Sequence, residues 1–225
     1  MYNGNGSNGG GNGSRSWWGK RSHEPESSLA PYRRLALQLH YDLPRPEHSR
    51  SALVVTPTAS LIAPHGSSDL ARCLAEQLQR PVLLVDACPG APQLSKILDC
   101  ESRPGFTDFL ANPTIPIDDL VLPTTHANLS FLPAGSGATS DHAFAPPHIQ
   151  SGLQAAEERF EFVIFSGASV LGNSVSLALA PWVGRVLLLA VENETRIEDL
   201  DAAQDALFFC KADKVGLVLT SLARR

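Results

Sequence analysis

Long hydrophobic runs are absent from this sequence. Its longest apolar stretches, such as Val82 to Val85 and Val186 to Val191, have the length of a β-strand, whereas a membrane-spanning helix needs about 20 apolar residues. The Gly-, Asn- and Ser-rich N-terminus also lacks the apolar segment of a signal peptide. We therefore expect a cytoplasmic protein that has no membrane span.

Positive charge is scarce as well. The 225 residues include 18 Lys and Arg against 23 Asp and Glu, so the formal net charge is −5. Basic residues occur in runs of no more than two, whereas nucleic-acid-binding proteins usually carry a basic stripe. Nucleic acid is therefore not an expected partner.

Cysteine is rare, with Cys73, Cys88, Cys100 and Cys210 far apart in the sequence. They form no CxxC pair and have no histidine at metal-ligand spacing, so a zinc site is not expected. A reducing compartment disfavours disulfides. We expect Cys73 and Cys210 to be small, buried core residues.

The histidines, serines and acidic residues do not form a recognisable catalytic motif either. His126, His142 and His148 lie in a polar, Pro-rich stretch, which favours a surface loop over a metal or acid–base site. The Ser-Gly-Ala-Ser string at 166–169 lacks the glycine spacing of a nucleophile elbow. The acidic group around residues 192–199 is typical of a solvated face.

Most of the chain alternates between β-branched apolar segments and amphipathic ones. Buried parallel strands read as continuous apolar runs, and the helices between them cover both faces of the sheet. The pattern predicts a doubly wound α/β fold with a mostly parallel sheet. We expect strands at Leu53–Val55, Val82–Asp86, Leu129–Leu132, Phe162–Phe165, Val186–Val191 and Val215–Leu219. We expect helices at Leu29–Tyr41, Asp69–Gln79, Phe106–Leu110, Ile149–Glu158, Ser174–Ala180 and Ile197–Lys211.

Residues 1–28 differ in composition from the rest of the chain. Asn, Gly and Ser dominate there, which predicts a disordered tail before a single domain over residues 29–225. Trp17 and Trp18 are the exception in this tail. They are either a chance aromatic patch or a short motif that docks on a partner or a membrane surface.

A lysine is missing where this fold would bind phosphate. A P-loop joins a strand to the next helix and carries a Gly-Lys-Ser/Thr triplet. If the helix begins at Asp69, Gly66, Ser67 and Ser68 fall at this position and supply hydroxyls but no ammonium group. Their backbone N–H groups can bind an anion at the helix start, or the same residues simply cap the helix.

Several short strings occur in the order typical of one family. From about Ser27 to Thr220 the chain resembles the bacterial tyrosine autokinases (BY-kinases) of capsule and exopolysaccharide synthesis, which belong to the deviant P-loop group together with the MinD and ParA ATPases. The strings are Tyr32-Arg33-Arg34-Leu35, Pro81-Val82-Leu83-Leu84-Val85-Asp86-Ala87, Pro104-Gly105-Phe106-Thr107-Asp108-Phe109-Leu110-Ala111, Asn128-Leu129-Ser130-Phe131-Leu132-Pro133-Ala134-Gly135, Phe160-Glu161-Phe162-Val163-Ile164 and Leu179-Ala180-Pro181-Trp182-Val183.

The resemblance implies a nucleotide site that is degenerate here. The lysine that clamps the phosphates and the hydroxyl that binds magnesium align with Ser67 and Ser68. The Asp-Ala-Asp motif aligns with Asp86-Ala87-Cys88, and the third-motif Asp aligns with Ser166. Asp86 is then either a functional relic or weak metal ligand, or a carboxylate that caps backbone amides and has no ligand.

Two further features of the family are incomplete in this sequence. The resemblance implies ring assembly through a Glu and two Arg spaced by three on the first helix, and the aligned residues are Ala30, Arg33 and Ala36. It also implies a C-terminal tyrosine cluster, whereas the three tyrosines of this sequence lie within its first 41 residues. We expect a monomer or a low-order dimer in isolation.

The expected function is therefore a non-catalytic, pseudokinase-like regulatory or scaffold subunit in exopolysaccharide or capsule biosynthesis or export. Its implied partner is a membrane chain-length determinant or polysaccharide co-polymerase, which would hold it at the inner membrane. No metal and no resident cofactor are expected. The alternative is an atypical kinase or ATPase that binds Mg-ATP weakly. The candidate partner-binding residues are Trp17, Trp18 and Arg33. The degenerate nucleotide site comprises Gly66, Ser67, Ser68, Asp86, Cys88 and Ser166.

Overall fold

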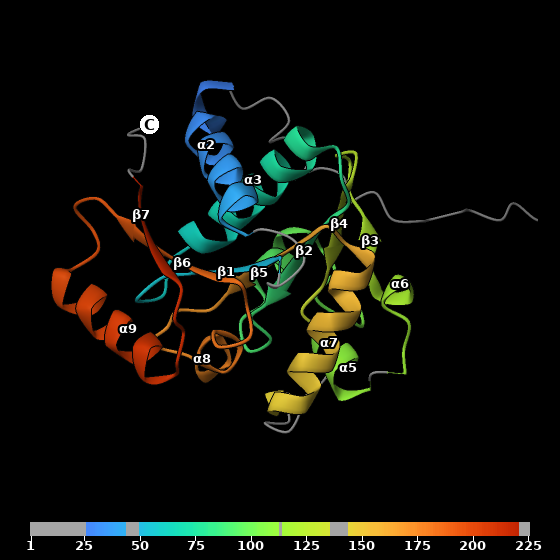
Figure 1. Cartoon of the computed structure of the whole chain (residues 1–225). Coiled ribbons are helices and arrows are strands. Elements are labelled where there is room, and N and C mark those ends of the chain that lie inside the picture. Colours follow the sequence, from blue (N-terminus) through green and yellow to red (C-terminus); the bar gives the residue numbers. More distant parts are fainter. Residues whose placement is uncertain (1–25, 44–49, 113, 136–143, 221–225) are drawn as a thin grey trace, which may run out of the picture.

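A computed structural model describes residues 26–43, 50–112, 114–135 and 144–220. Their centre is a seven-stranded sheet in the order β3-β4-β2-β5-β1-β6-β7, in which β3 is antiparallel to β4 and all other neighbouring strands are parallel (Figure 1). The strands are β1 (Ser51–Val55), β2 (Val82–Ala87), β3 (Leu122–Pro123), β4 (Leu129–Leu132), β5 (Phe162–Gly167), β6 (Arg185–Val191) and β7 (Val215–Thr220).

Helices cover both faces of this sheet. The helices are α2 (Glu26–Asp42), α3 (Ile62–Leu78), α4 (Gln93–Ile97), α5 (Phe106–Ala111), α6 (Ile117–Leu120), α7 (Pro146–Arg159), α8 (Ser174–Leu179) and α9 (Ile197–Phe209). In Figure 1, α2 and α3 lie above the sheet, while α7, α8 and α9 lie below it. The predicted doubly wound α/β fold is confirmed.

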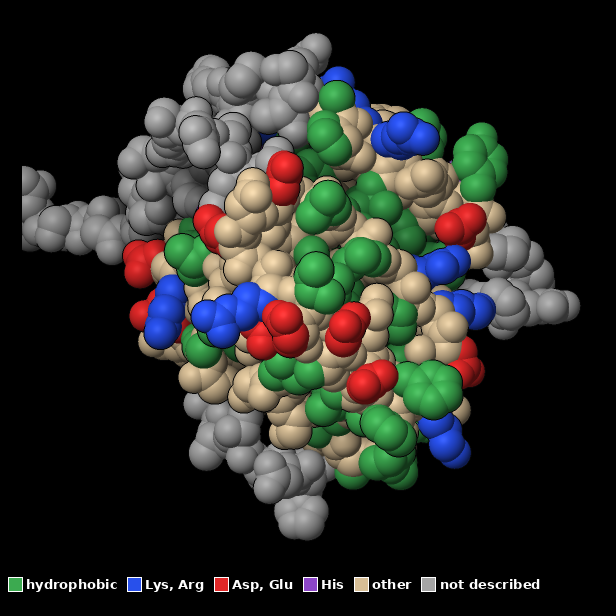
Figure 2. All heavy atoms as spheres, turned by 90° about the vertical axis from the view of Figure 1, so that its left-hand side faces the viewer, with side chains coloured by type: hydrophobic (Ala, Val, Ile, Leu, Met, Phe, Trp, Pro, Cys, Tyr) green, Lys and Arg blue, Asp and Glu red, His purple; other side chains and the backbone are tan. Residues whose placement is uncertain are grey.

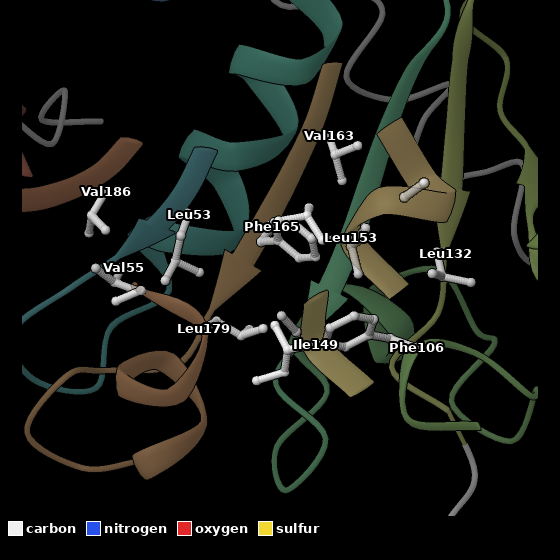
Figure 3. Close-up of a cluster of buried hydrophobic side chains, with 14 of the residues drawn as sticks. Leu53, Val55, Phe106, Leu132, Ile149, Leu153, Val163, Phe165, Leu179 and Val186 are labelled. Atoms are coloured by element: carbon white, nitrogen blue, oxygen red, sulfur yellow. The ribbon is translucent and has the colours of Figure 1, made fainter. Parts of the chain in front are cut away.

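The core divides into two clusters because side chains alternate between the faces of a strand. On β1, Leu53 and Val55 join the cluster under α5, α7, α8 and α9, whereas Ala52 and Val54 join the cluster under α2 and α3. Figure 3 shows the first cluster, in which Phe165 of β5 lies between β1 and the side chains of α5 and α7. Both faces of the central strands are therefore closed to water.

The six strands predicted from apolar runs are present, and each predicted helix is found. The predicted start of the second helix is wrong, because α3 begins at Ile62 and not at Asp69. Pro64 and Gly66 suggested a loop, but Pro is tolerated in the first turn of a helix, where its missing N–H has no intrahelical partner to lose. The short elements α4, α6 and β3 were not predicted.

Two of the family-like strings pack against each other. At the start of α5, Phe106 N donates to Pro133 O at 2.7 Å and Thr107 N donates to Ala134 O at 3.0 Å. A Cβ on Gly105 would collide with the Pro133 carbonyl oxygen, so this close approach requires glycine. The chain after β4 is thereby fixed to the start of α5.

None of the described helices combines the length and the apolar character that crossing a bilayer requires.

Candidate functional site

A polar pocket lies at the carboxyl ends of β1, β2 and β5, where open α/β sheets bind their ligands. Its cavity volume is about 160 Å³. The register places Asp86 of β2 directly beside Ser166 of β5, so the neighbouring strands end together at this edge. The lining residues are Thr56, Ala59, Ser60, Pro64, Asp86, Cys88, Ala91, Gln93, Ser166, Gly167, Ala168, Ser169, Gly172 and Asn173.

Asp86 is the only charged residue among the described residues that line this pocket, and it is 1% exposed. Its Oδ2 accepts hydrogen bonds from Ser95 N and Ser95 Oγ, both at 2.8 Å, and its Oδ1 accepts one from Cys88 N at 3.3 Å. Ser95 Oγ in turn accepts a hydrogen bond from Ala134 N at 3.0 Å. The carboxylate therefore joins β2, α4 and the chain after β4. Of the two interpretations left open for Asp86, the observed contacts are those of a cap on backbone amides.

Burial raises the pKa of Asp86 to about 6, although the hydrogen bonds from Ser95 and Cys88 act in the opposite direction. Desolvation thus outweighs the donors that favour the charged form. Burial, and then the nearby Asp86 charge, raises the pKa of the Cys88 thiol to about 11. A neutral thiol is a poor metal ligand, and the described residues contain no group of three His, Cys, Asp or Glu that could hold a metal ion.

Gly66, Ser67 and Ser68 do not lie in a phosphate loop. They occupy the second turn of α3 and are buried in it. Ser67 Oγ and Ser68 Oγ both donate to the Pro64 carbonyl, at 3.0 and 2.7 Å. A Cβ on Gly66 would lie 2.9 Å from Leu189 Cδ1 and 3.4 Å from the Tyr32 hydroxyl. This glycine therefore allows α3 to pack closely against β6 and α2, and the predicted placement of the phosphate loop is corrected.

The real connection between β1 and α3 runs over residues 56–61, and it contains neither glycine nor lysine. Ile62 N, the first amide of α3, donates to Ser60 Oγ at 3.2 Å. Pro64, in the first turn, lines the pocket and has no N–H. The helix start therefore offers little of the amide array that binds phosphate. A signal for this boundary was available, since connections in α/β units are usually about 2–6 residues long.

The structure brings some of the predicted site residues together and separates others. Asp86, Cys88 and Ser166 all line the pocket, whereas the triplet Gly66-Ser67-Ser68 lies within α3. Sequence reasoning missed Ser95, Thr56 and Asn173. Ser95 belongs to a short helix with no periodic signal, so its contact with Asp86 could not be seen in the sequence.

Helix α2 packs along α3 through residues that repeat on one side. Leu29, Ala36 and Leu39 of α2, and Leu43 just after it, are buried in the cluster that these helices form with the sheet, and Ala36 is 1% exposed. Arg33 is half-buried, and its carbonyl accepts a hydrogen bond from Gln77 Nε2 at 3.3 Å. Ala36 therefore lies in the core, and a long side chain there would meet α3.

Three smaller predictions need correction or lie outside the described residues. His148 lies in α7, where its Nδ1 is 2.9 Å from Leu110 O, so it is not in a loop. Cys73 is buried as predicted, but Cys210 is only half-buried. Trp17, Trp18 and His142 lie outside the described part of the chain.

No protein-family model matches the sequence. A curated relative, the tyrosine-protein kinase ptk of Acinetobacter johnsonii, is 24% identical over 159 residues, which are 70% of this chain and 21% of the relative. The chain therefore spans about a fifth of the length of the relative that it matches.

Solved structures extend the similarity to the whole fold. The kinase domain of the Escherichia coli tyrosine kinase ETK matches with a TM-score of 0.78 at 18% identity. This match covers 88% of this chain and 76% of the ETK chain. The VpsO kinase domain has a TM-score of 0.73 at 20% identity, over 88% of this chain and 98% of that one. A Cyanothece McdA structure has a TM-score of 0.64 at 16% identity, over 76% and 72%. The expected resemblance to bacterial tyrosine kinase domains and MinD/ParA-like proteins is confirmed, and at these identities it establishes the fold alone.

Proposed function

We propose that this chain is a non-catalytic, pseudokinase-like subunit that regulates or scaffolds exopolysaccharide or capsule biosynthesis or export. The observation that supports this proposal is the chemistry of the pocket at the carboxyl edge of the sheet. Its described lining contains hydroxyls, amides and one buried carboxylate, but no Lys or Arg. Phosphoryl transfer is catalysed almost entirely by positioned charge.

The electrostatics of the pocket do not suit a nucleoside triphosphate. A triphosphate carries several negative charges. The one charged side chain in the described lining, Asp86, can add only a further negative charge and would repel it. Its three donors come from Ser95 and Cys88, so this carboxylate is already engaged in holding the protein together. A nucleotide would meet few free amides at the start of α3 and no lysine. We therefore infer that the pocket is a degenerate nucleotide site.

A melting experiment with millimolar Mg-ATP tests this inference. A ligand that binds only the folded state raises the free energy of unfolding by RT ln(1 + [L]/Kd), which is about 0.4 kcal/mol when [L] equals Kd. We expect no measurable shift for the natural chain. The variant Pro64→Lys places an ammonium group in the pocket wall, and it should gain a response. Leu61→Lys is the matched control, because Leu61 is exposed and lies outside the lining.

The second candidate function is a weak ATP-binding kinase or ATPase. It is favoured by the position of the pocket, which is where this fold holds its ligand, and by a volume of about 160 Å³. Incubation with labelled ATP and magnesium separates the two candidates. Robust turnover, or phosphotyrosine on the protein, would establish the enzyme and contradict the regulator.

The proposed partner is a membrane chain-length determinant or polysaccharide co-polymerase, which would place the chain in the cytoplasm at the inner membrane. Support comes from the resemblance to bacterial tyrosine kinase domains. Trp17, Trp18 and Arg33 remain the candidate contacts. Co-sedimentation with membranes that contain such a protein should exceed co-sedimentation with matched membranes that lack it. Equal binding to both membranes would contradict this assignment.

A further inference from the structure

The two edges of the sheet differ in how they are protected. At one edge, β3 is two residues long, runs antiparallel to β4 and contains Pro123. At the other edge, β7 is six residues long, runs parallel to β6 and contains neither Pro nor a charged residue. Natural proteins usually blunt an exposed edge with a short strand, proline or charge. Among the described residues, only the β3 edge carries these devices.

Three residues of β7 direct their backbone groups away from the sheet. Val186 N donates to Lys214 O and Glu192 N donates to Thr220 O, both at 2.8 Å, so the even-numbered residues of this segment face β6. Parallel pairing alternates along a strand. The N–H and C=O groups of Val215, Leu217 and Leu219 therefore point outward, and no described strand lies on that side.

The side of the molecule that carries β7 and α9 also exposes apolar side chains. Leu217 is 50% exposed and Leu219 is 69% exposed. At the end of α9, Phe208 and Phe209 are 77% and 81% exposed. Figure 2 shows this side of the molecule, with hydrophobic side chains running down its centre and gathering again at its lower end. Single exposed leucines are ordinary, but here they lie along an open strand edge.

We propose that β7 pairs with β7 of a second copy of this chain, antiparallel and with the twofold axis at Leu217. In this register Leu217 faces Leu217 of the second copy, and Val215 faces Leu219. All three outward residues then form hydrogen-bonded pairs. Their side chains form three apolar cross-strand pairs on one face, the kind of pair that stabilises a sheet.

Charge favours the same arrangement. Lys211 and Lys214 flank the start of β7, together with Asp213. Glu192 lies beside the other end of β7, where its N–H bonds to Thr220 O, and Glu194 follows in the same turn. Among the described residues, an antiparallel twofold brings the lysine end of each copy to the glutamate end of the other. A surface that is complementary to itself in this way favours a second copy as its occupant.

Cysteine cross-linking tests the register. Opposed residues of a hydrogen-bonded pair have Cα atoms about 5.5 Å apart, which suits a disulfide. In a Cys210→Ser background, which removes the half-buried cysteine, Leu217→Cys should form a covalent dimer under mild oxidation. Leu219→Cys faces Val215 and should not link to itself, whereas Val215→Cys and Leu219→Cys combined should link. Efficient linking of Leu219→Cys alone would overturn this register.

Sedimentation across concentration tests the dimer itself. The interface is small for a permanent one, so we expect a reversible dimer that grows with concentration. Leu217→Lys places like charges directly opposite each other and should leave a monomer with an unchanged melting temperature at low concentration. Leu37→Lys, which alters a leucine of similar exposure on α2, should still dimerise. A monomer at every concentration, or a dimer that Leu217→Lys does not affect, would overturn the proposal.

Discussion

At the scale of single residues, a carboxylate at the carboxyl edge of the sheet performs a structural task. Asp86 ends β2 at the ligand-binding edge, yet its oxygens accept hydrogen bonds from Ser95 and Cys88. Removing a buried acceptor costs the desolvation of its stranded donors, typically about 1–3 kcal/mol. Loss of Asp86 would therefore destabilise the protein whether or not a nucleotide binds.

The raised pKa of Asp86 predicts a definite dependence of stability on pH. Its pKa is about 6 in the folded protein against an ordinary value of 3.8, so between about pH 4 and 6 the folded state binds more protons than the unfolded state. The free energy of unfolding contributed by this group therefore falls as pH rises through that window, by about 3 kcal/mol in all, and is flat above it.

Denaturant unfolding of the natural chain and of Asp86→Asn, which cannot titrate, measures this contribution. The stability of the natural chain relative to Asp86→Asn should increase as pH is lowered from 6 to 4. If that difference instead grows as pH rises, the donors from Ser95 and Cys88 outweigh burial, and the assigned direction of the pKa shift is wrong.

Gly105 offers a second test at this scale. A Cβ there would collide with backbone atoms of Pro133 and Gly135, and backbone cannot move aside as a flexible side chain can. Gly105→Ala should therefore lower the free energy of unfolding by about 1–3 kcal/mol or more. Gly90→Ala is the matched control, since a Cβ added at Gly90 would have no neighbouring atom within 4 Å. Equal melting temperatures for the two variants would contradict the close packing of these strings.

At the scale of elements, the strands formed by apolar runs were predicted correctly and the start of α3 was missed. Continuous apolar runs such as Phe162–Phe165 identify strands that are buried on both faces, and β5 includes that run. The start of α3 was missed because Pro64 and Gly66 are poor helix formers in general but are accepted here by their positions. Pro64 lies in the first turn, and Gly66 lies where Leu189 leaves little room.

The candidate site was predictable only as far as strand ends reveal it. Asp86 and Ser166 follow apolar runs, so their meeting at one edge follows from a parallel sheet, and the register confirms it. Ser95 and Asn173 reach the same region from segments whose positions depend on tertiary contacts. The short helix α4, for example, is tied to β2 by the Ser95–Asp86 hydrogen bonds.

Helix α2 carries a prediction of its own. Ala36→Arg restores the arginine that the resemblance implies, but it places a long cation at a position that is 1% exposed and faces α3. We expect it to destabilise the protein by about 3 kcal/mol or more, because an unpaired buried charge is costly. Ala30→Glu changes an exposed position on the same helix and should leave the melting temperature nearly unchanged. A stable Ala36→Arg variant would show that this face of α2 is open.

At the scale of the whole molecule, the order β3-β4-β2-β5-β1-β6-β7 places β6 between the polar pocket and the β7 edge. The pocket lies at the ends of β2, β5 and β1, two strands away from β7. The pocket and the proposed dimer contact at β7 therefore use different strands of the sheet. The predicted division into a tail over residues 1–28 and one domain over 29–225 stays a proposal, which limited proteolysis with mass determination of the fragments would test.

Assembly in isolation is the prediction that separates this chain most clearly from a ring-forming autokinase. Ring assembly in the family that it resembles needs a Glu and two Arg on the first helix, whereas this chain has Ala30, Arg33 and Ala36. Ala36 lies in the buried core, so even a substitution cannot present a second arginine to a neighbour without disturbing the core. Light scattering across concentration should show only monomer and dimer. A stable octamer without a partner would show that subunits assemble through other residues, and the monomer–dimer assignment would fail.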